Sequence, residues 1–244
     1  TVGALDNDLG VVGVAPGVSL WAVKVLAANG SGNVSDIIKG IDWVTAIAET
    51  IEIANMSLGG VGKNDAYRAA IQGSVAKGVV YVVAAGNEWR DILGDDLLFG
   101  TTDDTIPAAY PEVATISAIA DTDGLPGGIG PNTQYIDPKV GKYPDDSFAD
   151  FSNFSNSDGS DQSWYLVPGN NPVTSPGLGI DLMMPGVDIL STAPGGGYAT
   201  MSGTSMAAPH AAGLAALHVA QNGRATDAAG VYAIRQALID SGRP

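Results

Sequence analysis

From residue 18 onward, the hydrophobic and polar positions of the chain alternate between the period of a strand and that of a helix. Short runs that are apolar on both sides predict buried parallel strands, and apolar residues three or four positions apart predict helices between them. Strand, helix and strand in succession, with short connections, imply right-handed crossovers. The pattern therefore predicts an α/β fold, a doubly wound parallel sheet with helices on both faces. The predicted strands cover residues 18–26, 51–58, 79–85, 113–120, 180–184 and 189–192, and the predicted helices cover residues 35–50, 64–78, 205–220 and 226–241.

Polar residues and glycines bound the first two helices. Ser35 is the predicted N-cap of the first helix, and Asn64 or Asp65 opens the second. Gly78 is predicted to end the second helix, because glycine tolerates the left-handed backbone that commonly follows a helix.

Residues 121–179 break the alternation of strands and helices. Gly, Pro, Asn, Ser and Asp dominate this stretch, and aromatic residues such as Trp164 and Tyr165 are scattered through it. That aromatic content argues against a purely disordered linker, so we expect a long surface excursion with local packing. The sequence predicts a single domain over residues 1–244 with a surface insertion at about 121–179.

The composition narrows the classes of function. A net charge of −15 repels nucleic acid and anionic membranes, and simple solubility is its plainest explanation. No apolar run reaches the roughly eighteen residues that a membrane-spanning helix needs. The chain has no cysteine, which excludes disulfides, thiolate catalysis and cysteine-based zinc sites. We therefore expect no nucleic-acid partner and no membrane partner.

Residues 203–210, Gly-Thr-Ser-Met-Ala-Ala-Pro-His, carry the most specific candidate chemistry. Ser205 lies where a Gly-rich loop becomes an apolar helix, so small residues flank its hydroxyl at the positive end of a helix dipole. Backbone N–H groups at that position can meet the oxyanion that acyl transfer generates. An ordinary helix N-cap is the commoner role of such a hydroxyl, and the rest of the chain decides between the two.

Two further polar clusters follow predicted strands, and the carboxyl ends of parallel strands are where such sheets bind ligands. Gly59 and Gly60 follow one strand and Gly86 follows the next, and glycines let a substrate backbone approach closely. Asn87 offers an amide donor to an oxyanion, although a turn after a strand is the ordinary role of a lone Asn. The convergence of these features on one sheet edge favours catalysis.

These motifs resemble those of the subtilases, the subtilisin-like serine peptidases, over most of the chain. The resemblance implies a serine endopeptidase with Ser205 as the nucleophile and Asn87 as the oxyanion donor. It also implies that an extended polypeptide substrate binds by strand addition. The implied substrate-binding residues are Gly30, Ser31 and Gly32, which pair with the substrate backbone, and Ser57, Leu58, Gly59, Ala84 and Gly86, which line the primary specificity pocket.

Residues 5–11, Leu-Asp-Asn-Asp-Leu-Gly-Val, resemble the strong calcium loop of the same family. The ligands implied by the resemblance are the carbonyl oxygens of Leu5, Leu9 and Val11 and the side chain of Asn7. Oxygen ligands on a tight loop suit Ca²⁺, and an acidic turn that binds no ion is the alternative. The resemblance further implies an extracellular, secreted monomer with structural Ca²⁺ and no organic cofactor.

A serine nucleophile needs a general base, and the chain has only two histidines, His210 and His218. Both fall on the predicted helix of Ser205. At roughly 100° per residue, His210 lies about 140° around that helix from Ser205, and His218 lies about 20 Å along its axis. We therefore assign both histidines to packing or surface roles.

In the family, the catalytic Asp and His precede the calcium loop, so the resemblance implies that both precede Thr1. We expect the 244-residue chain by itself to have little or no activity. A pseudo-enzyme or peptide-binding domain that kept the cleft and lost the base is the alternative. A doubly wound nucleotide-binding protein is disfavoured, because no Gly-rich phosphate-binding motif opens a helix.

Overall fold

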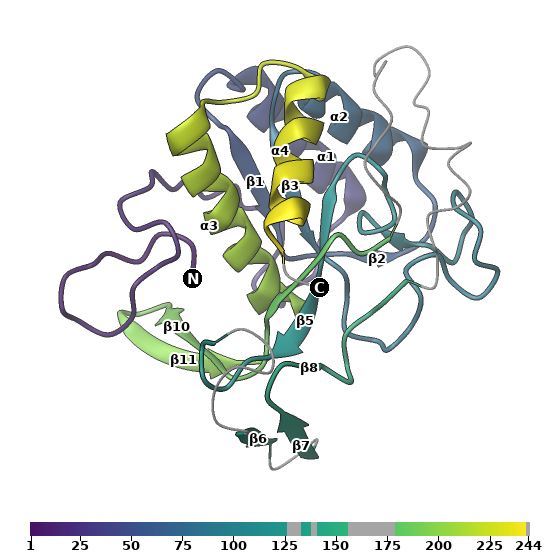
Figure 1. The fold of residues 1–244 in the computed structure, drawn as a ribbon. Helices are drawn as coiled ribbons and strands as arrows, with labels where there is room; N and C mark the ends of the chain where they lie inside the picture. Colours follow the sequence, from purple (N-terminus) through teal and green to yellow (C-terminus); the bar gives the residue numbers. More distant parts are fainter. Residues whose placement is uncertain (126–132, 138–140, 156–178, 243–244) are drawn as a thin grey trace.

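The computed structural model describes residues 1–125, 133–137, 141–155 and 179–242, and Figure 1 shows how their helices and strands are arranged. A five-stranded sheet lies at the centre of these residues. Its buried strands follow the continuous apolar runs of the sequence, and every residue of the third strand along the chain is buried. The strands β1 (Ile53–Met56), β3 (Val80–Ala84), β5 (Ala114–Ala120) and β9 (Leu182–Pro185) run parallel in this order, and β8 (Ser147–Phe148) pairs antiparallel with the end of β5.

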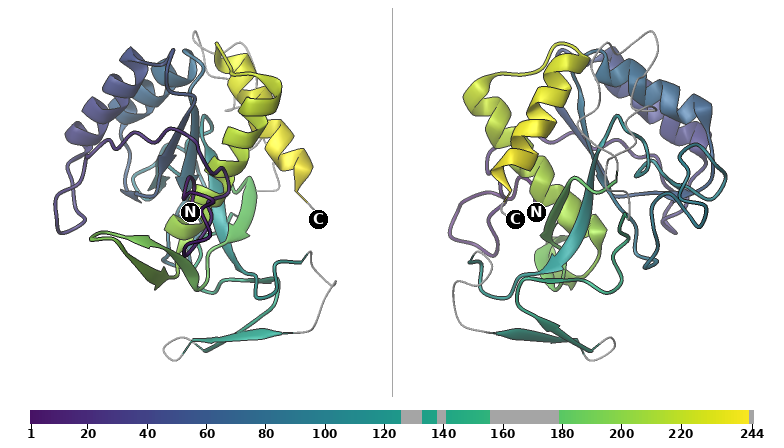
Figure 2. Two further views of the ribbon diagram at one scale, coloured as in Figure 1. Left: turned by 90° about the vertical axis from the view of Figure 1, so that its left-hand side faces the viewer. Right: turned by 45° about the vertical axis from the view of Figure 1, so that its right-hand side comes forward.

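Helices cover both faces of the sheet, as the left view in Figure 2 shows. The helices α1 (Val34–Ala46) and α2 (Asp65–Val75) pack together on one face. On the other face, α3 (Thr204–Asn222) lies against β1, β3, β5 and β9, and α4 (Ala228–Ser241) packs beside it. The predicted doubly wound α/β fold is therefore confirmed.

The close approach of α3 to the sheet follows from its sequence. Its buried face consists largely of alanines, and Ala207, Ala208, Ala211 and Ala215 have no exposed surface. A methyl side chain holds the helix nearer to the strands than a longer side chain would, and it retains a high helix propensity. The small-residue face thus places the start of α3 close to the ends of the strands.

Within the described part of the chain, three smaller two-stranded sheets lie outside the central one. The strand predicted at residues 189–192 exists, but it forms an antiparallel pair outside the parallel sheet. The pairs are β2 (Gly60–Val61) with β4 (Thr105–Ile106), β6 (Gln134–Asp137) with β7 (Gly141–Pro144), and β10 (Ile189–Ala193) with β11 (Gly197–Met201). Figure 2 shows β6 and β7 projecting away from the helices. Trp164 and Tyr165 of the predicted insertion lie outside the described residues.

No strand forms at residues 18–26, contrary to the prediction. A strand needs a hydrogen-bonded neighbour, and this segment has none among the residues that the structure describes. Leu20 and Trp21 are 68% and 55% exposed. The other side of the segment contacts α1, where a Cβ on Gly40 would lie 2.5 Å from Cγ1 of Val25. The apolar pattern thus marked a segment that packs on a helix without pairing in the sheet.

The helix starts agree with the prediction in one case and differ in the other. Asn64 caps α2 as predicted, and its Oδ1 accepts a hydrogen bond from Tyr67 N at 2.9 Å. The N-cap of α1 is Asn33 and not Ser35, because the carbonyl of Asn33 already accepts from Ile37 N at 3.2 Å. The helix also ends at Ala46, before the predicted residue 50.

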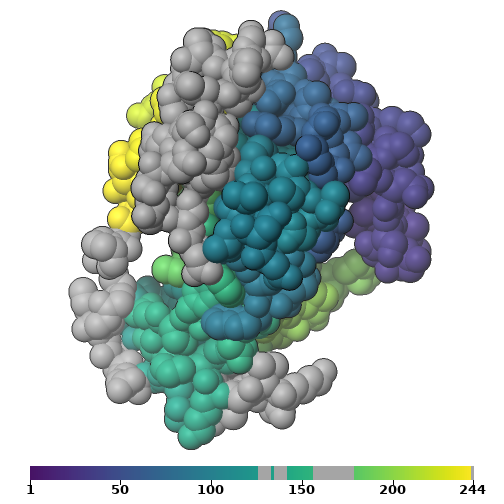
Figure 3. Space-filling view, turned by 90° about the vertical axis from the view of Figure 1, so that its right-hand side faces the viewer, coloured from purple at the N-terminus to yellow at the C-terminus, as the bar shows by residue number. Residues whose placement is uncertain are grey.

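The segment between β3 and β4 lies at the molecular surface, where Figure 3 shows it in teal between the blue of α2 and the green of residues 141–155. Backbone hydrogen bonds join it to that green segment: Phe154 N donates to Arg90 O at 3.1 Å, and Ile92 N donates to Phe154 O at 2.9 Å. The chain that follows β3 is therefore held by residues more than sixty positions later in the sequence.

Candidate active site

Ser205 occupies the second position of α3, and the N-cap of this helix is Gly203. The hydroxyl of Ser205 is therefore not the helix cap, which removes the ordinary explanation for a serine at this place. Gly203 has a φ of 156°, a conformation that favours glycine, and its N–H donates to Gly186 O at 2.7 Å. The start of α3 is thus tied to the residue that follows β9, at the carboxyl edge of the sheet.

Asn87 comes directly after the turn that ends β3, and it is hydrogen-bonded to the residue before Ser205. Its Oδ1 accepts from Thr204 N at 2.8 Å and from Thr204 Oγ1 at 3.1 Å. The same Thr204 hydroxyl accepts from Gly86 N at 3.1 Å. Because Oδ1 is engaged by α3, the amide Nδ2 of Asn87 is left to donate elsewhere, and it has no hydrogen-bond partner among the described residues.

Ser57, at the end of β1, is hydrogen-bonded to Ser205 itself. Its Oγ donates to Ser205 O at 2.9 Å and accepts from Asn55 Nδ2 at 3.0 Å. Within a helix, Ser205 O would accept from the N–H four residues later, but that residue is Pro209, which has none. The Ser57 hydroxyl therefore supplies the donor that Pro209 withholds, and it joins β1 to the start of α3.

The predicted pocket walls are brought to the same sheet edge. Ala84 is buried at the end of β3, and Leu58 is half-buried after β1. A Cβ on Gly59 would lie 3.2 Å from Ile106 O, so the wall that follows β1 packs closely on β4. Gly86 has a φ of 106°, which a side chain would strain. The structure thus gathers Ser57, Gly59, Ala84 and Gly86 with Ser205 and Asn87, without assigning roles to them.

Gly30, Ser31 and Gly32 lie in an exposed turn before α1. Ala27 N donates to Ser31 O at 2.8 Å, and Gly30 N donates to Ala27 O at 3.0 Å. Gly30 has a φ of 80°, as a tight turn of this kind requires. Within residues 1–125, no hydrogen bond links this turn to the residues around Asn87.

Neither histidine ring hydrogen-bonds to Ser205. His210 Nδ1 lies 2.9 Å from Met206 O on its own helix, and His218 Nδ1 lies 3.4 Å from Asn222 Nδ2. Burial lowers the pKa of His210. The helical geometry predicted from the sequence holds, so the described residues place no imidazole beside the Ser205 hydroxyl.

The loop proposed for calcium is closed at its base and open at its tip. Gly13 N donates to Ala4 O at 2.9 Å, which brings the two ends of the loop together. Leu5 and Leu9 are exposed, and Asn7 Oδ1 accepts from Leu9 N at 3.3 Å. One carboxamide oxygen and several carbonyl oxygens on a closed loop are a donor set of the type that Ca²⁺ prefers, so the residues present fit that ion.

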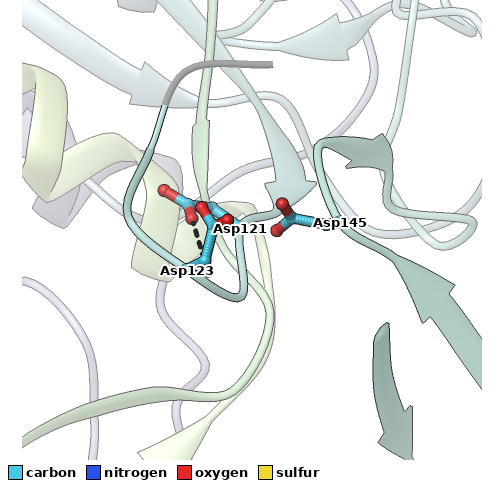
Figure 4. Close-up of side chains that lie close together, drawn as sticks. All are labelled: Asp121, Asp123 and Asp145. Carbon is cyan, nitrogen blue, oxygen red and sulfur yellow. Dashed lines mark hydrogen bonds between the residues drawn. The ribbon is translucent and has the colours of Figure 1, made fainter. Parts of the chain in front are cut away.

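A second group of oxygen donors, which the sequence analysis missed, lies after β5. Figure 4 shows Asp121, Asp123 and Asp145 converging, and one carboxylate oxygen of each lies within 4.8 Å of the others. Asp123 N donates to Asp121 Oδ1 at 3.2 Å, while Asp123 Oδ2 is buried without a hydrogen-bond partner. These carboxylates could hold a cation. The Asp-x-Asp spacing was visible in the sequence, but the contribution of Asp145 depends on the fold.

A half-buried serine hydroxyl at the start of a helix lies beside an asparagine amide at the carboxyl edge of a parallel sheet. This is the arrangement of a candidate acyl-transfer site. Comparisons with known proteins then define the family. The subtilase family profile matches residues 1–243, and the chain belongs to the subtilase family. No helix among the described residues combines the length and the apolar character needed to cross a bilayer.

The individual relatives are subtilisin-like proteins. Subtilisin E of Bacillus subtilis (strain 168) is 36% identical over 228 residues, which cover 93% of this chain and 46% of the relative. Alkaline elastase YaB of Bacillus sp. (strain YaB) is 35% identical over 217 residues, which cover 89% of this chain and 42% of the relative. A crystal structure of a cold adapted subtilisin-like serine proteinase matches with a TM-score of 0.61 at 31% identity, covering 93% of this chain and 60% of that one. The chain therefore spans less than half the length of the two curated relatives.

Proposed function

We propose that this chain is the nucleophile-bearing part of a serine endopeptidase. The observation that supports the proposal is the fixed pairing of Asn87 with Thr204, the residue next to Ser205. With Oδ1 of Asn87 bound to α3, its Nδ2 is available to an oxyanion. The backbone N–H of Ser205, in the first turn of α3, is the second donor.

The reaction follows from these positions. Ser205 Oγ attacks the scissile carbonyl carbon while a general base takes its proton, and the charge that develops on the carbonyl oxygen is met by the Asn87 Nδ2 and Ser205 N–H donors. The tetrahedral adduct collapses to an acyl-enzyme as the leaving amine takes a proton, and water then releases the acid. The rings of His210 and His218 contact their own helix, so the described residues place no imidazole where it could act as this base.

The central sheet has an open edge beside the candidate site. β1 pairs with β3 on one side, and on the other side it has no partner strand within the part of the chain that the structure describes. A largely apolar cavity of about 780 Å³ lies there, and its lining includes Trp21, Trp43 and Met56. A further strand paired with β1 would end at the same sheet edge as Ser57, beside Ser205.

The substrate is an extended polypeptide, and the protein is a secreted, extracellular monomer. Relatives named subtilisin and alkaline elastase support the polypeptide substrate. The small walls at Ser57, Gly59, Ala84 and Gly86 favour a large apolar side chain in the specificity pocket. Structural Ca²⁺, held by the carbonyl oxygens of Leu5, Leu9 and Val11 and by Asn7, would stiffen the closed N-terminal loop. In this role the ion cross-links the loop and takes no part in peptide cleavage.

A peptide-binding domain without turnover is the second candidate, and the absence of an imidazole near Ser205 among the described residues favours it. A fluorophosphonate probe and a peptide substrate separate the two. We expect the complete protein to be labelled at Ser205 and to hydrolyse peptides, while the 244-residue chain does neither. Asn87→Ala should lower kcat about 100-fold or more with little change in KM. A complete protein that binds peptides but neither hydrolyses them nor reacts at Ser205 would establish the binding function instead.

A further inference from the structure

Asn153 is a fully buried side chain that the chemistry above does not use, and all of its hydrogen-bonding capacity is directed at the loop that carries Asn87. Its Nδ2 donates to Ala85 O at 3.0 Å and to Glu88 Oε2 at 2.9 Å. Its Oδ1 accepts from Glu88 N at 2.9 Å and from Arg90 N at 3.2 Å. A carboxamide has two donor hydrogens and two acceptor lone pairs, so this side chain is completely satisfied.

The backbone of Asn153 adds to these contacts and is itself held by the sheet. Its N–H donates to Gly86 O at 3.0 Å. Its carbonyl accepts from Ser117 Oγ at 2.7 Å, and Ser117 is a buried residue of β5. Asn153 is therefore fixed to the centre of the sheet, which makes it a rigid support for the loop at residues 85–90.

Glu88 carries the contact from Asn153 to Asn87. The Oε2 atom of Glu88 accepts from Asn153 Nδ2 and also from Asn87 N, the latter at 2.9 Å. Gly86 is required between them, because a Cβ there would lie 2.3 Å from Asn153 Nδ2 and 2.6 Å from Glu88 Oε2. Asn153 thus holds the main chain on both sides of Asn87, while Thr204 holds the Asn87 side chain.

We propose that Asn153 is a positioning residue for the oxyanion hole, acting through Glu88 on the peptide groups that present Asn87. This inference rests on the proposed function of Asn87. Preorganised donors stabilise an oxyanion most when they need not reorganise during the reaction. Loss of Asn153 would leave the donor present but no longer held in place, so the effect should fall on the transition state more than on substrate binding.

The experiment compares variants of the complete protein. Asn153→Ala should lower kcat by about 10- to 100-fold with KM changed by less than about threefold. In the Asn87→Ala background, the same substitution should have almost no further effect on kcat, because the donor it positions is gone. Thr115→Val is the matched control: it removes the hydroxyl of another buried residue, which donates to Ala108 O at 2.7 Å and contacts neither Asn153 nor the loop, and kcat should be unchanged.

Two isosteric substitutions, Asn153→Asp and Glu88→Gln, distinguish a loss of positioning from misfolding of the variant. Asn153→Asp keeps the volume and the acceptor positions but places a carboxylate against that of Glu88, so kcat should fall. Adding Glu88→Gln lets the new amide donate to the carboxylate introduced at position 153 while its oxygen accepts from Asn87 N, so part of the activity should return. A fall in kcat that persists undiminished in the Asn87→Ala background, or the absence of rescue by Glu88→Gln, would overturn the inference.

Two further measurements distinguish a failure of this inference from a failure of the proposed function. If Asn87→Ala leaves kcat unchanged, the oxyanion role of Asn87 fails whatever Asn153 does; if only Asn153→Ala is silent, the positioning role alone fails. For a protein without turnover, the NMR order parameter of the Asn87 side-chain amide gives the answer. We expect it to fall in Asn153→Ala and to stay at the parent value in Thr115→Val. An unchanged order parameter in Asn153→Ala would refute the positioning role.

Discussion

The hydroxyl of Ser57 donates a hydrogen bond to the carbonyl oxygen of Ser205 at 2.9 Å, across 148 positions of sequence. Pro209 makes this bond possible, because it removes the N–H that a helix would otherwise offer to the same carbonyl. A proline inside a helix normally weakens it, yet here the vacant acceptor becomes the link between β1 and the start of α3. The hydrogen bond that Pro209 cannot donate is thus replaced by one from Ser57, the residue that follows β1.

We predict that Ser57→Ala lowers the free energy of unfolding by about 1 kcal/mol, because Ser205 O loses its donor. In a Pro209→Ala background the loss should be smaller, since the N–H of residue 209 then bonds to that carbonyl within α3. A double-mutant cycle by urea denaturation measures the difference. Equal losses in both backgrounds would show that the Ser57 hydroxyl does not compensate for Pro209. Ser57→Thr, which keeps a hydroxyl, is the control.

The fold was predictable where the apolar pattern was compatible with only one environment, that of a strand buried in the central sheet. β3 and β5 are buried almost throughout, and their continuous apolar runs predicted this. Residues 18–26 show the same pattern, but no strand forms there. A pattern records which side chains avoid water and does not record whether a neighbouring backbone is present to pair with. The prediction was wrong for that reason.

The candidate site was predictable in part because its residues lie in short motifs after strands. The proximity of Asn87 to α3 was foreseeable, because the end of β3 and the start of α3 both lie at the carboxyl edge of the parallel sheet. The contacts of Asn153 were not, because they join residues 65 positions apart through a segment with no regular pattern. The hydrogen bond between Ser57 and Ser205 was likewise not predictable. The sequence indicated only that the carbonyl of Ser205 needs another donor, because Pro209 has no N–H.

Removal of calcium tests the N-terminal loop. We predict that a chelator lowers Tm of the complete protein, and that Asn7→Ala lowers Tm in calcium and abolishes most of the response to the chelator. Binding to the folded state alone stabilises it in proportion to the logarithm of the ion concentration, so Tm should rise with added Ca²⁺. Differential scanning calorimetry at several Ca²⁺ concentrations makes the measurement.

The carboxylates after β5 supply the contrast for this experiment. Asp123→Asn changes a group whose Oδ2 is buried without a partner, and it leaves the N-terminal loop untouched. If the chelator response disappears in Asp123→Asn and persists in Asn7→Ala, the ion that stabilises the protein is held by Asp121, Asp123 and Asp145.

Asp104 predicts a pH dependence of stability. Burial raises the pKa of Asp104 to about 6, while hydrogen bonds from Gly100 and Thr101 oppose the shift. The folded state therefore holds this proton more tightly than the unfolded state does. The associated stability is fully present below the unfolded pKa of 3.8 and is lost as the pH rises through 6.

We predict that Asp104→Asn gains stability relative to the parent as the pH rises. The amide keeps an acceptor for Gly100 N and never ionises, so the difference should grow by roughly 1 to 3 kcal/mol between about pH 4 and pH 7. Urea denaturation of both proteins at each pH gives the difference, in which the other titrating groups cancel. A difference that is constant with pH would mean that Asp104 titrates alike in the folded and unfolded states.

The ion pair between Arg235 and Asp181 anchors α4 to the start of β5 and β9. Both side chains are 3% exposed, and Arg235 Nη2 lies 2.7 Å from Asp181 Oδ1. Asp181 Oδ2 accepts from Thr115 N at 2.7 Å, so one carboxylate joins the helix to the sheet. Burial raises the pKa of Asp181, and the guanidinium of Arg235 opposes that rise.

Removal of Arg235 alone should therefore cost more than removal of both charges. We predict that Arg235→Met lowers the free energy of unfolding by about 3 to 5 kcal/mol at pH 7, because a buried carboxylate loses its partner. Asp181→Asn added to Arg235→Met should recover most of this loss, since the amide oxygen still accepts from Thr115 N and no charge remains. The loss in Arg235→Met should also be smaller at acidic pH than at pH 7, because the unpaired Asp181, whose pKa burial raises, then takes a proton and no longer needs a counter-charge. Urea denaturation at the two pH values separates this account from a packing effect: a loss of packing against α4 would be the same at both, and Asp181→Asn would not repair it.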